Sequence, residues 1–326
     1  MTLQKVRTKN AECPRFGSFC LIFLLLFSLA LMLRRADVAA DRMQKGLSLC
    51  ARAVVPSLFP FMVLSELLVS SGAGEWLLSP IASPLGRLLG LSRAGCCAVV
   101  LGLVCGFPVG ARCAILAYEK GTVSKSECER AIACSSIPSS AFLVGTVGTM
   151  LWQNAKFGVF LYISVVISAL LSGFLLYVWQ KRRQKREEAL SAPSPLCIRF
   201  DGKMFTSAIR NATMNTLLIS AYVVFFFTLT GAVGLILDRF AANEGMQAVL
   251  GSILELSGGV STASGLANRY LAMLLTGAAV GWSGISVHCQ MLSLCEGHDI
   301  SLRPYLIAKL LQTVGCVAMV SLFYMI

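Results

Sequence analysis

Long apolar stretches separated by short charged connections run through most of the chain. Residues 16–33 contain no charged side chain, and as a helix rising 1.5 Å per residue they would reach about 27 Å, close to the thickness of a bilayer's hydrocarbon core. The pattern predicts an all-α, polytopic transmembrane helical bundle with about seven to nine spans. Further apolar stretches lie at 56–72, 95–118, 156–179, 206–237, 246–266, 270–294 and 302–326.

Four of these stretches are interrupted by residues that cannot continue an undisturbed helix. The interruptions fall at 106–110, 135–140, 255–259 and 281–284. Non-helical backbone at membrane depth persists only where protein buries it or where it lines a water-filled cavity. We therefore expect broken or re-entrant helices around an interior site, although small residues that merely pack helices together are the alternative for any single break.

An internal duplication is indicated when the chain is shifted by 175 positions. Gly102 and Gly106 then fall on Gly277 and Gly281, and an aromatic residue follows the second glycine in each copy. Chance similarity between two apolar stretches is the alternative. The duplication predicts residues 1–40 as a basic tail and anchor, 41–179 as a first repeat, 180–205 as a basic linker and 206–326 as a second repeat. Residues 16–33 could instead be a cleaved signal peptide, because basic residues precede them.

Composition and charge exclude several other classes of protein. Hydrophobic residues make up 56% of the chain and charged residues 13%, whereas soluble domains have about 25% charged residues. The net charge of +12 comes from Lys and Arg between apolar runs, eight of them in 181–210. This is typical of a cytoplasmic loop rather than of nucleic-acid binding. The 13 cysteines form no Cys-x-x-Cys pair and there are two histidines, so we expect no metal and no cofactor.

Ionisable residues at membrane depth are costly and are therefore functional candidates. Arg112 follows the first break, and we expect its fork of donors to bind an anionic substrate, with a lipid headgroup or a glutamate as the alternative partner. Glu66 and Glu255 are predicted to bind a coupling cation or carry a proton. A structural pairing at a helix end is the alternative for each.

Small polar and aromatic residues at the breaks complete the predicted substrate site. Glycine lets a ligand approach the backbone, serine supplies donors, and the N-terminus of a half-helix favours an anion. Two aromatic residues could sandwich a flat ring or simply pack against helices. The predicted binding residues are Gly106, Phe107, Pro108, Gly110, Arg112, Ser135, Ser136, Ser139, Ser257, Gly258, Gly259, Trp282, Ser283, Gly284, Ser286 and Gln290.

The string from Gly281 to Gly284 also matches a serine protease motif, but the geometry argues against catalysis. His288 lies five residues beyond Ser283, which is roughly 140° further round a helix, so its ring would point away from the serine. We expect no catalytic residue and no enzyme activity.

Taken together, three motifs resemble the sporulation integral membrane protein YlbJ (SpoVV) family. The motifs are PSLFPF at 56–61 running into SELL at 65–68, GLVCGFPVGA at 102–111, and SGISVHCQ at 283–290 followed by PYLIAK at 304–309. The resemblance implies that both repeats are Gate-like, because the family carries the nucleoside-recognition (Gate) domain. It also implies inverted repeats.

The resemblance further implies transport of dipicolinate, a planar dianion, across the outer forespore membrane of a spore-forming bacterium. The inventory of donors suits such an anion, and no phosphate-binding loop of an ATPase occurs. Two alternatives stay open. The chain could be a non-transporting membrane assembly or docking factor for another sporulation membrane protein, or it could be a nucleoside transporter. The oligomeric state is not predicted.

Overall fold

The computed structural model describes residues 26–30, 32–183, 198–239 and 243–325, and every regular element in these ranges is a helix. The predicted all-α helical bundle is therefore confirmed. Most of the predicted anchor at 16–33 and of the predicted linker at 180–205 lies outside the described residues.

The first half opens with a rod made of α2 (Ala36–Leu49), the π-helix η1 (Cys50–Val54) and α3 (Val55–Ser71). Two short helices, α4 (Ala73–Leu77) and α5 (Ser79–Leu89), lead to the core of this half. That core consists of α6 (Arg93–Cys105), α7 (Val109–Glu119), α8 (Lys125–Ser135), the π-helix η2 (Ala141–Leu151) and α9 (Ala155–Arg183).

The second half contains α10 (Gly202–Arg239), α11 (Glu244–Leu254), α12 (Leu256–Ser264), α13 (Arg269–Trp282), α14 (Gly284–Leu294) and α15 (Arg303–Met325). Each half thus has the same order of elements. A long rod is followed by a helical hairpin (α6–α7 or α11–α12), then by a broken helix (α8–η2 or α13–α14), and then by a closing helix. The four predicted breaks are confirmed.

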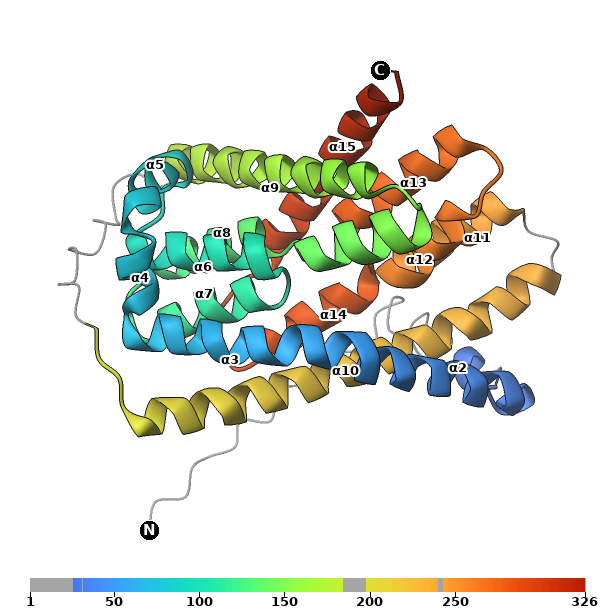
Figure 1. The fold of residues 1–326 in the computed structure, drawn as a ribbon, viewed down its shortest axis with the longest axis horizontal. Helices are drawn as coiled ribbons and strands as arrows, with labels where there is room; N and C mark the ends of the chain where they lie inside the picture. Colours follow the sequence, from blue (N-terminus) through green and yellow to red (C-terminus); the bar gives the residue numbers. More distant parts are fainter. Residues whose placement is uncertain (1–25, 31, 184–197, 240–242, 326) are drawn as a thin grey trace, which may run out of the picture.

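The two hairpins enter the molecule from opposite ends. In Figure 1 the hairpin α6–α7 joins its neighbours at the left end of the molecule, whereas α11–α12 joins its neighbours at the right end. The tips of both hairpins lie in the interior. This is the arrangement that two halves of opposite orientation produce.

Glycines allow the two arms of each hairpin to touch. A Cβ added at Gly110 would lie 2.5 Å from Cα of Gly102, and one at Gly259 would lie 2.3 Å from Cα of Ser252. A shift of 149 positions superposes Gly102 on Gly251 and Gly110 on Gly259. The shift of 175 is a wrong register, because it aligns a hairpin with the broken helix α13–α14.

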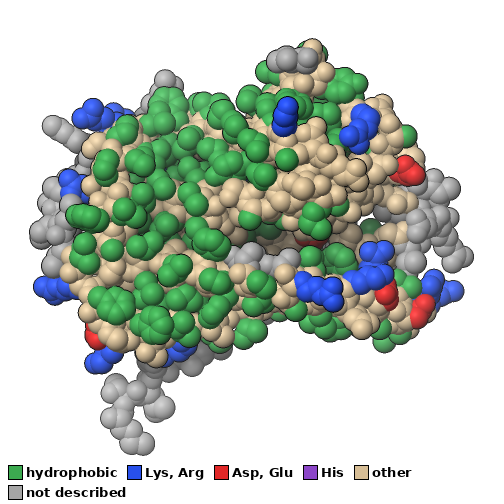
Figure 2. Space-filling model, viewed as in Figure 1, with side chains coloured by type: hydrophobic (Ala, Val, Ile, Leu, Met, Phe, Trp, Pro, Cys, Tyr) green, Lys and Arg blue, Asp and Glu red, His purple; other side chains and the backbone are tan. Residues whose placement is uncertain are grey.

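Four described helices are long and apolar enough to cross a membrane, and the pair α5 and α6, bent by 97°, would make a fifth. The four are Ala155–Lys181, Gly202–Gly234, Arg269–Leu294 and Arg303–Met325. Seven to nine spans were predicted for the whole chain, including residues 16–33, most of which are not described; among the described residues the number is lower than expected because apolar stretches such as 246–266 fold as two short helices. Figure 2 shows apolar side chains over much of the visible face, with Lys and Arg at its left edge, at the top and on the right side. Such a distribution is that of an integral membrane protein.

The two halves share a buried apolar core. Val165 of α9 and Leu143 of η2 belong to the same cluster as Val260 of α12, Val280 of α13 and Val320 of α15. Since these side chains are buried and come from both halves, their packing fixes the breaks of one half relative to those of the other.

Gly102→Ala tests the contact inside the first hairpin. The added Cβ would lie 2.9 Å from Cα of Gly110 in the other arm and 2.4 Å from Cβ of Ser135 in α8, and we expect the overpacking to lower the free energy of unfolding by about 1–3 kcal/mol. Thermal unfolding of the purified protein in detergent measures this change. Gly145→Ala is the matched control, because no atom lies within 4 Å of the added methyl group. Equal melting temperatures for the two variants would contradict the described packing.

Candidate functional site

The tip of the first hairpin rests on the break in α8–η2. Gly106 ends α6 with φ +81°, and a Cβ there would lie 2.5 Å from the backbone nitrogen of Ser139. The backbone N–H of Phe107 donates to the carbonyl of Ile137 at 2.7 Å. The structure therefore brings together predicted site residues from two separate breaks of the first half.

Ser135 lies beside the same tip, where α8 ends. An added Cβ at Gly102 or Gly110 would meet its side chain, and its buried hydroxyl has no hydrogen-bond partner among the described residues. Ser136 is also buried, but its hydroxyl donates to the carbonyl of Ile132 at 2.6 Å. Pro108, the residue before α7, is buried at the tip. At this tip, the hydroxyl of Ser135 therefore has free hydrogen-bonding capacity in the interior.

The second hairpin makes the corresponding contact with α13–α14. Glu255 forms its tip and caps α12, because its carboxylate accepts from the backbone N–H of Ser257 at 3.0 Å and of Gly258 at 2.6 Å. A Cβ added at Gly284 would lie 3.1 Å from Cα of Glu255. Glu255 was predicted as an ion-coupling residue, with a structural pairing at a helix end as the alternative. The structure shows such a pairing, because its carboxylate caps α12.

Ser283 separates α13 from α14 in a left-handed conformation, with φ +72°. This conformation costs a residue with a side chain about 1–2 kcal/mol, so neighbouring contacts must hold it. One such contact comes from α15, where Lys309 Nζ donates to the Ser283 hydroxyl at 2.9 Å. Lys309 is 0% exposed.

Sequence reasoning missed Lys309 as an ionisable residue at membrane depth. The available signal was its position, because it is the one charged residue between Pro304 and the end of the chain. Gln312, one turn further on, was also missed. Its side-chain amide donates to the carbonyl of Ala133 at 3.0 Å and lies 3.3 Å from the hydroxyl of Ser172. Helix α15 therefore contacts the breaks of both halves through polar side chains.

Aromatic side chains surround the second break. The ring of His288 lies edge-on to Trp282, with 4.4 Å between the ring centroids, and its Nδ1 is 2.7 Å from the hydroxyl of Tyr305. Trp282 also lines a pocket of about 190 Å³ between α11, α13 and α15. Ser286 and Gln290 lie further along α14 and bond to each other at 3.2 Å. His288 thus bonds to Tyr305, whereas the Ser283 hydroxyl accepts from Lys309 and donates to the carbonyl of Val280 at 3.3 Å.

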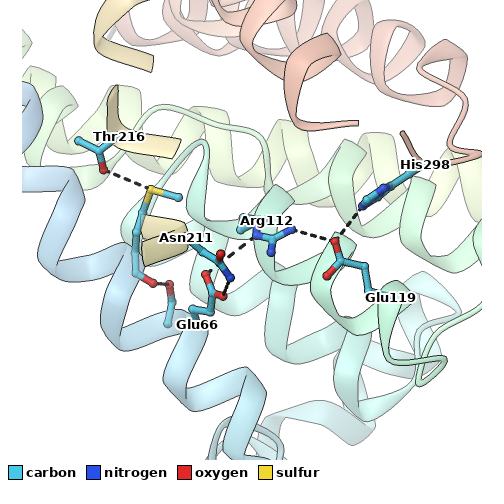
Figure 3. A network of polar contacts seen from close by, with 8 residues as sticks. Glu66, Arg112, Glu119, Asn211, Thr216 and His298 are labelled. Atoms are coloured by element: carbon cyan, nitrogen blue, oxygen red, sulfur yellow. Dashed lines mark hydrogen bonds and ion pairs between the residues drawn. The ribbon is translucent and has the colours of Figure 1, made fainter. Parts of the chain in front are cut away.

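Arg112 lies in a separate network of charged groups (Figure 3). Its Nη1 is 3.1 Å from Oε1 of Glu119 and its Nε is 4.0 Å from Oε2 of Glu66. Asn211 donates to the other oxygen of Glu66 at 2.6 Å, and His298 contacts Glu119 at 2.8 Å. The alternative pairing of Arg112 with Glu66 is therefore present, and the predicted ion-coupling residue Glu66 contacts Arg112 and Asn211 in this network.

No three side chains of His, Cys, Asp or Glu gather as metal ligands within the described ranges. The chemistry of the two tips is instead that of hydrogen-bond donors. Helices α7 and α14 both begin at a break, and neither has a side-chain cap at its first turn. Their first backbone N–H groups therefore offer the positive ends of two helix dipoles to the interior.

Comparison with known proteins supports the resemblance indicated by the motifs. No family model matches the chain, and no solved structure matches it. The chain is similar to the sporulation integral membrane protein YlbJ of Bacillus subtilis (strain 168), with 24% identity over an alignment of 348 positions that covers 95% of this chain and 83% of that protein. Because it runs almost from end to end, this similarity supports the resemblance to the YlbJ sporulation integral membrane proteins.

Proposed function

We propose that the chain is a membrane transporter that moves a small planar anion, dipicolinate first among the candidates, across the outer forespore membrane during sporulation. The observation that carries this proposal is the pair of interior contacts between a hairpin tip and a helix break, one in each half. The relative from B. subtilis is a sporulation membrane protein, which supports the cellular setting. The Gate domain remains a prediction from the motifs.

Interior breaks suit the binding of an anion. Non-helical backbone inside a membrane protein is tolerated where it is buried in protein or lines a cavity, and transporters use such half-helix starts to hold anionic groups. The uncapped starts of α7 and α14 supply N–H donors. Ser135 and Ser283 add hydroxyl groups beside them. A flat ligand with two carboxylates would find a donor group at each break.

The same geometry favours a carrier over an enzyme. The Nε2 of His288 has no hydrogen-bond partner among the described residues, and the Ser283 hydroxyl contacts Lys309 and the carbonyl of Val280 instead, so the serine and histidine do not form a nucleophile–base pair. The proposed role of the chain is therefore binding and movement of a solute without a covalent step. The energy for this movement would come from an ion gradient, from the substrate gradient or from a partner.

Uptake into liposomes tests the proposed function. We expect purified protein to accumulate labelled dipicolinate and not uridine, in the presence of a Na⁺ or proton gradient or of the substrate gradient alone. Uridine uptake would indicate a nucleoside transporter. Absence of uptake of either compound by folded protein would instead favour a membrane assembly factor that needs a partner.

Gly106→Ala should abolish this uptake, because a methyl group at that position would collide with the backbone of Ser139 at the tip. Gly121→Ala is the matched control. Both glycines have positive φ, so both substitutions strain the backbone, but nothing lies within 4 Å of a Cβ added at Gly121. Equal uptake by the two variants would show that the first tip is not part of the transport site.

Arg112→Gln distinguishes a substrate ligand from a structural ion pair. The substitution leaves the carboxylate of Glu66, which is 4% exposed, without its cation, and we expect the free energy of unfolding to fall by about 3–5 kcal/mol. The double variant Arg112→Gln with Glu66→Gln should recover most of this loss and retain uptake. Restored stability with no uptake would instead assign Arg112 to the substrate.

A further inference from the structure

We propose that Lys309 is the residue that binds the carboxylate of the transported anion, at the break between α13 and α14. This inference rests on the proposed function for the role of the site, and it adds a binding residue on α15, a helix with no predicted site residue. Lys309 is fully buried and has no counter-ion among the described residues.

Six charged side chains are classed as buried in the described part of the chain, and five of them have partners that suit their charge. Among these, Glu255 accepts two backbone N–H groups, Glu127 accepts the N–H of Ser92, Glu129 accepts the N–H of Ser301, and Arg130 donates to the carbonyl of Gly90 and to Gln180. The fifth, Glu66, lies in the network with Arg112.

Lys309 differs from these five in having a single, neutral partner. Its ammonium has three N–H donors, and the hydroxyl of Ser283 accepts one of them. No carboxylate of the described residues lies within 4.0 Å of its nitrogen. A buried cation without a counter-ion destabilises the fold, and in membrane proteins such residues mark substrate or ion paths.

The position of Lys309 explains how an anion would compensate the charge. The ammonium contacts Ser283, the residue immediately before α14, and α14 begins there without a side-chain cap. The first N–H groups of an 11-residue helix and a buried ammonium therefore meet at one break. A carboxylate at this point would accept from both, which is the donor arrangement of helix N-terminal anion sites.

The same contact could in principle serve a different chemistry, because a serine paired with a lysine is also a nucleophile–base pair of some hydrolases. The direction of the hydrogen bonds argues for ligand binding. The Ser283 hydroxyl donates to the carbonyl of Val280 at 3.3 Å and accepts from Lys309, whereas a general base would have to accept the serine proton. A fluorophosphonate probe, which labels activated serines covalently, separates the two readings experimentally.

Calorimetric titration of the purified full chain with dipicolinate, picolinate and benzoate tests the proposal. We expect Lys309→Met to weaken carboxylate binding by at least about tenfold and Lys309→Arg to retain part of it. Arg303→Gln is the matched control, because it removes an exposed cation from the first turn of the same helix. Its affinity should equal that of the unmodified chain.

Thermal unfolding supplies a readout that a purely structural lysine would not give. Without ligand, Lys309→Met should melt at a higher temperature than the unmodified chain, because it removes an uncompensated buried charge. Added carboxylate should raise the melting temperature of the unmodified chain and leave that of Lys309→Met unchanged. A Lys309→Met variant that melts lower and binds carboxylate normally would show a structural role and overturn the proposal.

The outcomes separate this inference from the proposed function. Normal carboxylate binding by folded Lys309→Met, together with uptake by the unmodified chain, would overturn the role of Lys309 and leave transport standing. Lysine-dependent carboxylate binding without uptake would support the site and overturn transport. Labelling of Ser283 by the fluorophosphonate, or failure of the unmodified chain to bind any of the three carboxylates, would overturn the inference.

Discussion

Backbone groups that leave a helix inside an apolar environment must find partners within the protein, and this constraint governs the arrangement of the whole molecule. At the first break, the N–H of Phe107 bonds to the carbonyl of Ile137, and the hydroxyl of Ser140 bonds to the carbonyl of Val104. The hydroxyl of Tyr162 from α9 reaches the carbonyl of Leu103. The hairpin tip and the broken helix thus supply hydrogen-bond partners for each other's backbone groups. Neither would be stable at this depth without the other.

The need for mutual contact also explains where glycine is required. Two arms of a hairpin can share one site in the interior only if their backbones approach closely, and the pairs Gly102 with Gly110 and Gly251 with Gly259 provide that approach. At the tip of the second hairpin the free backbone N–H groups find a different partner. The carboxylate of Glu255 accepts the N–H groups that begin α12. The two halves therefore share a framework and differ in the charge at the tip.

The apolar stretches and their interruptions were sufficient to predict the fold class and the positions of all four breaks. They could not distinguish a hairpin from a kinked span, because both consist of two apolar half-helices joined by a non-helical turn. That distinction depends on which backbones touch, as Gly259 and Ser252 do. The predicted register of the repeat was wrong for the same reason. Glycines of the hairpin α6–α7 were matched with glycines of the broken helix α13–α14, which pack differently.

The charged residues of the site were harder to predict than the breaks. Arg112 was singled out because it follows a break, but its guanidinium reaches Glu66 and Glu119. Glu66 is distant from it in sequence, and Glu119 lies two turns further along the same helix. Lys309 was overlooked because α15 has no break of its own. Its role arises from packing, since the closing helix of the second half brings a side chain to a break in another helix.

Helix α15 gives the two breaks a common support. Lys309 bonds to Ser283 in the second half, and Gln312, one turn away, bonds to the carbonyl of Ala133 just before the break of the first half. Both side chains are fully buried, so a rotation or shift of α15 would strain polar contacts on both sides. By contrast, a hairpin tip contacts the following broken helix through a few backbone groups. Any opening of the site would therefore disturb fewer buried polar contacts by moving a hairpin than by moving α15.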